Sequence, residues 1–140
     1  MKIEVFRLNL LSPLYYVSEK AADPFGYKEG DGEKIFCFEL DKTQTGEFEP
    51  DTARFLETLV FCGRASDGAD GQPHTELPQG NYLFAQKREI ASRKDIMEMA
   101  VEIQQEGLWQ RLLCGKKLYL RYLFEDGRPV TQLFRPCTET

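Results

Sequence analysis

The chain has 140 residues, and 18 Lys and Arg against 23 Asp and Glu give it a formal charge of -5. A chain of this length forms one domain and buries a sufficient core without disulfide or metal staples. No apolar run approaches the ~20 residues that cross a bilayer, and charges near the N-terminus replace the apolar stretch of a signal peptide. We therefore expect a single cytoplasmic domain over residues 1–140, without membrane contact and with a long flexible loop at about 63–80.

The negative charge is concentrated in the first half of the chain. Residues 1–78 contain 8 basic and 15 acidic residues, whereas residues 79–140 contain 10 basic and 8 acidic residues. A nucleic-acid-binding protein needs a basic face, so this distribution disfavours direct binding to nucleic acid. One local cluster of basic residues is present, and it contains Lys87, Arg88, Arg93 and Lys94. We interpret it either as a solvent-exposed corner or as an anion-binding site at a helix N-terminus.

The residues that most often carry catalysis form no recognisable set. Each Cys is isolated, without the paired spacing of zinc ligands, and we interpret all four as small hydrophobic residues: Cys37, Cys62, Cys114 and Cys137. His74, the only imidazole, lies in the long loop, and no nucleophile or phosphate-loop motif is present. The sequence predicts no catalytic residue, no metal and no cofactor, and it favours a protein without enzymatic activity.

The predicted elements begin with a strand over residues 2–9 and a second short strand over residues 14–17. A loop rich in Gly and Pro follows at 21–34, and alternating hydrophobicity predicts a strand over residues 35–40. Pro50-Asp51 is typical of a helix start. Four apolar residues then recur at helical spacing, and Gly63 is expected to end this shorter helix: Phe55, Leu56, Leu59 and Val60.

From residue 82 the pattern predicts a strand over 82–86 and then a long helix. Ser92 is the expected N-cap, with Asp95 three residues later in a weakened capping box. Ile96, Met99, Ala100 and Ile103 form one apolar stripe, and a second stripe follows on a different side of the helix: Leu108, Trp109, Leu112 and Leu113. Gly107 lies between the stripes, so we expect the helix to break there and to end at Gly115.

Two alternating runs, residues 118–125 and 128–135, flank Asp126-Gly127. Asp-Gly at this position predicts a two-residue type I′ hairpin, because both central residues need a positive φ. The turn fixes the register so that Arg121 lies opposite Gln132 and Tyr119 lies opposite Phe134. These elements predict an α+β fold, in which an antiparallel sheet of five or six strands carries one long broken helix and one shorter helix on one face.

The hairpin has two different faces. One face is expected to pack under the helix and contains Leu118, Leu120, Tyr122, Phe124 and Leu133. The other face interleaves aromatic and aliphatic residues with one cation and one amide: Tyr119, Arg121, Leu123, Val130, Gln132 and Phe134. This mixture is typical of ligand pockets, which are mostly apolar with a few polar groups. The alternative is a packed face with Arg121 at its rim.

Residues 77–136 resemble one βαββ half of the gyrase-inhibitor-like effector-binding domains. The resemblance is carried by Leu77-Pro78-Gln79-Gly80-Asn81-Tyr82-Leu83-Phe84, by the helix that follows, and by two strands that end in Gln132-Leu133-Phe134-Arg135-Pro136. The resemblance implies a small-molecule cleft between two such halves. The N-terminal half departs from the family pattern, and the acidic residue that often meets cationic drugs in that family has no equivalent in this sequence.

These observations lead to two main function hypotheses, beside a third, an unrecognised hydrolase or thiol enzyme for which the sequence indicates no substrate. The first is a non-catalytic, effector-like module that binds a small molecule through Tyr119, Arg121, Gln132 and Phe134, with Tyr82 or Trp109 nearby. A guanidinium beside aromatic rings favours an anionic or aromatic ligand. The second is a protein-interaction or homo-oligomer-forming subunit that buries the same aromatic face against a partner.

Overall fold

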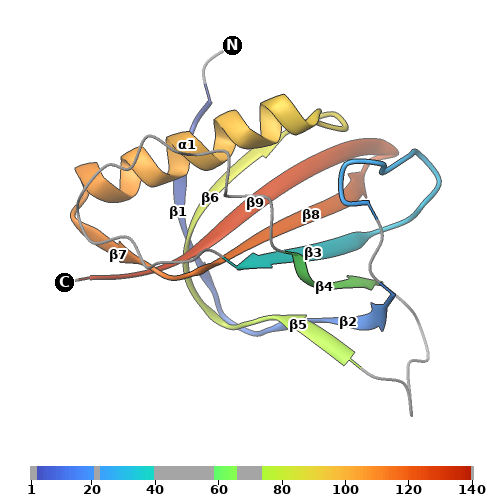
Figure 1. Ribbon diagram of the computed structural model, residues 1–140, viewed down its shortest axis with the longest axis horizontal. Helices are drawn as coiled ribbons and strands as arrows, with labels where there is room; N and C mark the ends of the chain where they lie inside the picture. Colours follow the sequence, from blue (N-terminus) through green and yellow to red (C-terminus); the bar gives the residue numbers. More distant parts are fainter. Residues whose placement is uncertain (1–2, 21–22, 40–58, 66–73, 140) are drawn as a thin grey trace.

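The computed structural model describes residues 3–20, 23–39, 59–65 and 74–139. Nine strands and one helix occupy these residues, and Figure 1 shows their arrangement. In chain order the elements are β1 (Phe6–Leu10), β2 (Leu14–Glu19), β3 (Lys34–Glu39), β4 (Leu59–Arg64), β5 (His74–Leu77), β6 (Gly80–Lys87), α1 (Arg93–Trp109), β7 (Leu112–Cys114), β8 (Lys117–Glu125) and β9 (Arg128–Glu139).

The strands form one antiparallel sheet in the order β1-β6-β9-β8-β3-β4-β2-β5, and β7 pairs separately with β9. The expectation of five or six strands and two helices is therefore wrong. Within the described ranges the sheet dominates, α1 is the one helix, and the three unexpected strands are β4, β5 and β7. Each of these strands arises where the sequence pattern predicts a helix or a loop.

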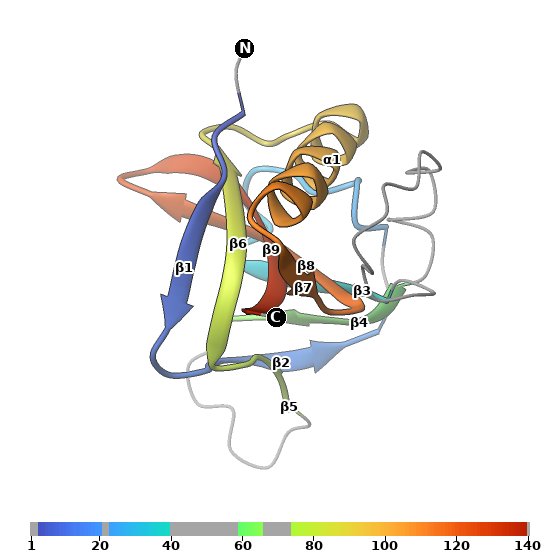
Figure 2. The same cartoon turned by 90° about the vertical axis from the view of Figure 1, so that its left-hand side faces the viewer.

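A bent two-stranded ribbon gives the sheet its curvature. β1 leads into β2 through residues 11–13, and β5 leads into β6 through residues 78–79. These two stretches pair on both sides of the bend, with Leu10 opposite Gly80 before it and Leu14 opposite Leu77 after it. Gly80 has a φ of 150°, a conformation that favours glycine at such a corner. The sheet consequently curls into the half-barrel seen in Figure 2.

The long helix is continuous through Gly107, so the expected break is wrong. Gly107 is buried within α1. Arg111 ends the helix by adopting a φ of 58°, and the backbone N–H of Gln110 still bonds to the carbonyl of Glu106. The second apolar stripe is therefore divided between the helix end and β7, and Gly115 follows a strand instead of capping a helix.

The prediction of a shorter helix is wrong for the C-terminal part of that segment. Leu59–Arg64 forms β4, which pairs with β2 and β3, whereas residues 40–58 lie outside the described ranges. A short apolar run fits a buried strand as well as a helix, and periodicity alone does not separate them. The predicted loop at 63–80 is also shortened, because it begins in β4 and ends in β5 and β6. His74 opens β5 and is exposed.

The hairpin of β8 and β9 is confirmed in detail. Asp126 and Gly127 both have positive φ, and the pairs Arg121–Gln132 and Tyr119–Phe134 lie in the predicted register. The expected N-cap is also present, since the Ser92 hydroxyl accepts a hydrogen bond from the Asp95 backbone N–H at 3.2 Å. Local turn and cap signals were sufficient at both positions.

Two packed clusters lie on opposite faces of the sheet. The helix-face core joins α1 to the sheet and includes Ile96, Met99, Ile103, Leu118, Leu120 and Leu133. The inner-face core lies on the opposite face and consists of Tyr16, Ile35, Cys37, Leu77, Tyr82, Tyr119 and Phe134. No helix of the described ranges is long and apolar enough to cross a membrane.

Candidate functional site

The inner face carries one row of polar side chains across neighbouring strands. Arg121 on β8 lies opposite Gln132 on β9, which in turn lies opposite Gln86 on β6. On the other side of Arg121, the neighbouring position is occupied by an apolar residue, Ile35 on β3. Because side chains alternate along a strand, the next row on this face lies two residues further along and contains Cys37, Tyr119, Phe134 and Phe84.

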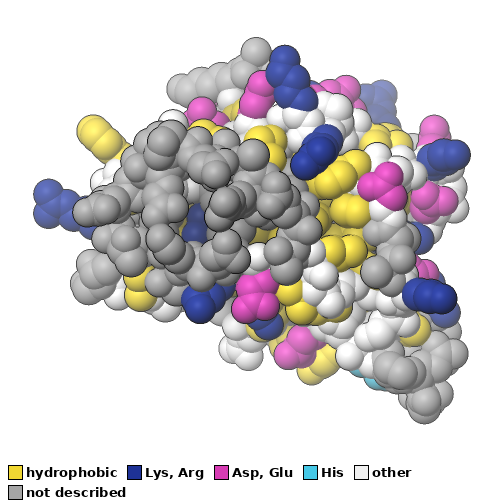
Figure 3. Space-filling view, viewed as in Figure 1, with side chains coloured by type: hydrophobic (Ala, Val, Ile, Leu, Met, Phe, Trp, Pro, Cys, Tyr) yellow, Lys and Arg dark blue, Asp and Glu magenta, His cyan; other side chains and the backbone are white. Residues whose placement is uncertain are grey.

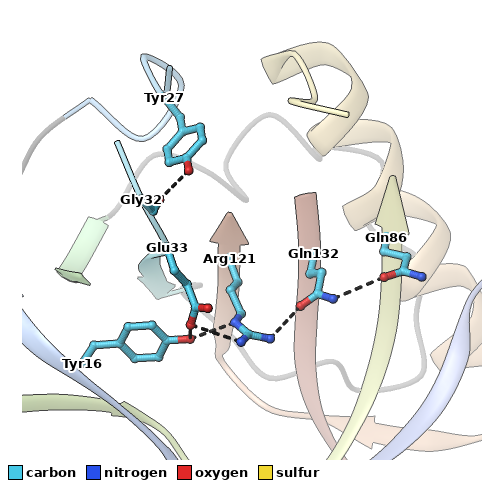
Figure 4. Close-up of polar contacts among 7 residues, drawn as sticks. All are labelled: Tyr16, Tyr27, Gly32, Glu33, Gln86, Arg121 and Gln132. Carbon is cyan, nitrogen blue, oxygen red and sulfur yellow. Dashed lines mark hydrogen bonds and ion pairs between the residues drawn. The ribbon is translucent and has the colours of Figure 1, made fainter. Parts of the chain in front are cut away.

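Arg121 is the centre of a hydrogen-bonded network, shown in Figure 4. Its Nε donates to the Tyr16 hydroxyl at 2.8 Å, its Nη1 to Gln132 Oε1 at 3.0 Å, and its Nη2 to Glu33 Oε2 at 3.1 Å. Glu33 Oε2 also accepts the Tyr16 hydroxyl at 2.8 Å. Gln132 Nε2 continues the chain by donating to Gln86 Oε1 at 3.2 Å. We call these five residues the Arg121 network.

The Arg121 network lies at the boundary between core and solvent. The Arg121 side chain is 16% exposed and the Glu33 side chain 30% exposed, so the ion pair is only partly desolvated. Tyr16 is buried, and burial raises the pKa of its phenol well above the ordinary value, although the Arg121 cation acts in the opposite direction. Tyr16 therefore remains a neutral donor to Glu33 at physiological pH.

Three predicted site residues form an aromatic floor that lies beside the Arg121 network on the inner face. Tyr82, Tyr119 and Phe134 are each at most 3% exposed. The Tyr82 ring meets the rings of Tyr119 and Phe134 edge to face, at centroid distances of 6.2 and 5.8 Å. Such contacts hold the rings in fixed positions. The structure thus brings these three residues together with Arg121 and Gln132, but as packed side chains in the neighbouring rows of the same face.

Trp109 is not part of this assembly. It lies in the last turn of α1, which packs on the opposite face of the sheet, and it is 85% exposed. The sequence predicts a place for Trp109 near the ligand-binding face and also assigns it to the second apolar stripe of the helix. Its neighbours in that stripe became strand β7, so the stripe does not dock as one helical face.

Sequence reasoning missed three members of the Arg121 network: Tyr16, Glu33 and Gln86. Gln86 falls on the same side of β6 as Tyr82 and Phe84, so strand alternation places it on the right face. The sequence gives no register between β6 and β9, however, and that register decides that Gln86 lies beside Gln132. Glu33 lies in the Gly- and Pro-rich segment, where no periodicity exists.

Two residues of the basic cluster at the start of α1 form ion pairs with carboxylates, and a third lies over an aromatic ring. Lys87 Nζ lies 2.6 Å from Asp95 Oδ2 and 2.7 Å from Glu89 Oε1. Arg88 lies 3.7 Å from Glu125, and the Arg93 guanidinium lies 5.5 Å from the centre of the Phe25 ring. Figure 3 shows acidic and basic side chains interspersed on the face it presents. The contacts favour a solvated, paired corner over an anion site.

The described residues contain no group of three or more His, Cys, Asp or Glu side chains that could hold a metal ion. A scan against protein-family models finds no match to the chain, and a search among curated proteins finds no significant relative. The geometry of the inner face therefore carries the functional argument alone.

Proposed function

We propose that this chain is a non-catalytic module that binds a small polar molecule over the Arg121 network. The observation that carries the proposal is the contrast within the inner face, where a partly exposed polar row borders a closed aromatic floor. Binding sites commonly combine an apolar wall with a few fixed polar groups. The order β6-α1-β8-β9 also agrees with the βαββ half of the gyrase-inhibitor-like domains, with β7 inserted.

Glu33 changes the class of ligand that we expect. Its carboxylate neutralises the Arg121 guanidinium at 3.1 Å, so a simple anion would approach one cation and one anion together. Within the described part of the chain, Glu33 Oε1 and Gln86 Nε2 have no hydrogen-bond partner. One is an acceptor and the other a donor. We therefore favour a neutral or zwitterionic ligand that donates and accepts hydrogen bonds, such as a carboxamide.

A matched pair of probes tests this proposal. Benzamide and benzoate have nearly the same shape but differ in charge and in donor groups. We expect benzamide to shift the side-chain amide signals of Gln86 and Gln132 in an NMR titration, and benzoate to shift them less. The exposed Gln105 on α1 supplies an internal control signal. The proposal is wrong if neither probe moves the Gln86 and Gln132 signals.

Variants then separate the contribution of the Gln86 amide from that of the Glu33 charge. Gln86→Ala should weaken benzamide binding, whereas Gln105→Ala should leave it unchanged. Glu33→Gln removes the carboxylate charge while keeping an acceptor, so the site gains net positive charge and should now prefer benzoate. An unchanged preference in Glu33→Gln would show that Glu33 does not set the ligand charge.

A second candidate function, protein interaction, has one specific observation in its favour. Trp109 and Leu113 lie on either side of the turn between α1 and β7 and are 85% and 43% exposed. Trp is enriched at the centre of protein interfaces. Because Trp109 is the only Trp in the chain, a blue shift of its fluorescence with rising protein concentration would report self-association, and sedimentation of Trp109→Ala would show whether the residue drives it.

A further inference from the structure

The short strand β7 brings together two cysteines that are distant in the sequence. β7 pairs antiparallel with the end of β9, and in this register Cys114 lies directly opposite Cys137. Figure 1 shows β7 beside the C-terminal end of β9. Both side chains are buried, at 0% and 3% exposure, and both carry free thiols.

The hydrogen-bond pattern of this ladder fixes the spacing of the two cysteines. The backbone N–H of Gly115 donates to the carbonyl of Pro136 at 2.8 Å, which makes Gly115–Pro136 a hydrogen-bonded pair. Pairs alternate along an antiparallel ladder, so Cys114–Cys137 is a non-hydrogen-bonded pair. The Cα atoms of such a pair lie roughly 4.5 Å apart, within the range of about 4.4–6.8 Å that a disulfide spans.

The pairing of β7 with β9 is maintained although one residue of the ladder is a proline. Pro136 has no N–H, so it cannot return a hydrogen bond to the Gly115 carbonyl. The Arg135 guanidinium supplies that bond instead, with Nε donating to the Gly115 carbonyl at 3.2 Å. Arg135 is itself buried, and its guanidinium acts to lower the pKa of the Cys114 thiol, against the larger raising effect of burial. The contact holds β7 in the register that opposes the two thiols.

We propose that Cys114 and Cys137 form a reversible dithiol site, which closes to a disulfide when it reacts with a small disulfide such as oxidised glutathione. The Sγ of Cys137 attacks one sulfur of the oxidant, forming a mixed disulfide and releasing one glutathione thiolate. The Sγ of Cys114 then attacks the Cys137 sulfur and releases the second glutathione. Two electrons pass from the cysteine pair to the oxidant, and the two glutathione thiolates take up the two thiol protons.

An oxidant can reach the buried thiols when the short ladder between β7 and β9 opens locally. β7 has three residues and pairs only with the final residues of β9, so this ladder should open locally more often than the central strands. Cys137 has the greater exposure of the two, which makes it the first to react. Burial raises the pKa of both thiols, so we expect slow reaction that depends on this opening.

The other two cysteines provide an internal control. Cys62 lies opposite Phe36, and Cys37 lies opposite Phe61, so neither has a cysteine as its cross-strand neighbour. Cys37 belongs to the inner-face core, whereas Cys62 belongs to the helix-face core. A disulfide between them would require a rearranged sheet.

The test uses the full chain, reduced and then incubated at pH 8 with oxidised glutathione under native conditions. After the remaining thiols are alkylated, trypsin digestion should yield the peptide of residues 112–116 linked to that of residues 122–140. The intact mass should fall by two hydrogen atoms, and the thermal midpoint should rise by several degrees because the new bond constrains the unfolded chain. Reduced glutathione should reverse both changes.

Three results would overturn the proposal: stable mixed disulfides without a link between the two peptides, a link that includes Cys37 or Cys62, or a link that forms only in urea. A Cys37→Ala/Cys62→Ala variant should form the same linked pair as the native chain, whereas Cys114→Ala should stop at the Cys137 mixed disulfide. Peptide mapping of the native chain decides the pairing even if a variant fails to fold.

Discussion

The two faces of the curled sheet are filled in different ways. The helix-face core is largely aliphatic and sulfur-containing, and its polar contacts include bonds to backbone groups: Tyr122 donates to the Pro24 carbonyl at 2.7 Å, and the Thr131 hydroxyl accepts from the Ala91 N–H at 3.0 Å. The inner-face core has a floor of aromatic rings and ends in the Arg121 network. Apolar packing tolerates small shifts, whereas a hydrogen-bonded network requires fixed geometry. This contrast associates stability with the helix face, and the site that we propose for ligand binding lies on the inner face.

Leu120 and Arg121 are neighbours in β8 that point to opposite faces, so they allow a direct comparison. Leu120 is completely buried in the helix-face core. We expect Leu120→Ala to reduce the free energy of unfolding by about 2–5 kcal/mol, because it removes buried methyl groups and leaves a cavity. Urea denaturation would measure the loss. A change below about 1 kcal/mol would contradict the assignment of Leu120 to a rigid core.

Arg121→Met should have the next largest effect. Methionine keeps much of the side-chain length but removes three donors, so Tyr16, Glu33 and Gln132 each lose a hydrogen bond. A hydrogen bond to a charged group contributes about 1.5–3 kcal/mol, and the partial exposure of Glu33 lets water replace some of it. We expect a loss of about 2 kcal/mol in the same denaturation assay. Equal or greater stability would show that the Arg121 network does not stabilise the fold.

Gly63→Ala tests how closely β4 approaches the bent ribbon on the inner face. A Cβ at this position would lie 2.7 Å from Thr75 Cγ2 and 2.8 Å from Tyr16 Cβ. Such overpacking costs about 1–3 kcal/mol, and the strain falls on Tyr16, a member of the Arg121 network. Gly127 cannot serve as control because its φ is positive, but Ser18→Ala on β2 is a suitable one. Unchanged stability in Gly63→Ala would mean that the ribbon can move away from β4.

The free energy of unfolding should decrease measurably as the pH rises above 10, because a tyrosine on the inner face is buried. Burial, with a smaller contribution from Glu76, raises the pKa of Tyr82 from 10.0 to about 12. Between these values the unfolded chain loses the phenol proton and the folded chain retains it, so stability is complete below pH 10 and falls as the pH rises toward 12. One such group contributes a slope of about 1 kcal/mol per pH unit. Tyr82→Phe should remove that part of the slope, whereas Tyr15→Phe, which alters an exposed ring, should not.

The sequence predicted those parts of the fold that depend on local chemistry. Asp126-Gly127 specified the hairpin and its register, and Ser92 specified the start of α1. It did not predict β4, β5 or β7, whose strand character comes from pairing with distant segments and not from their own pattern. The turn also placed Arg121 opposite Gln132, because both residues belong to this hairpin. Glu33 and Gln86 join the Arg121 network only through contacts between segments that are distant in the sequence.

The bent ribbon has a consequence for the way the chain is made. β1 and β2 are synthesised before every segment with which they pair, because their partners are β6, β5 and β4. On a ribosome, the exposed strand edges of β2 therefore wait until residue 77 has emerged, and those of β1 wait until residue 84 has emerged. The hairpin of β8 and β9 pairs near neighbours in the sequence, whereas β3 is synthesised long before its partner β8. The N-terminal strands β1, β2 and β3 therefore complete their pairing only after later segments of the chain have been made.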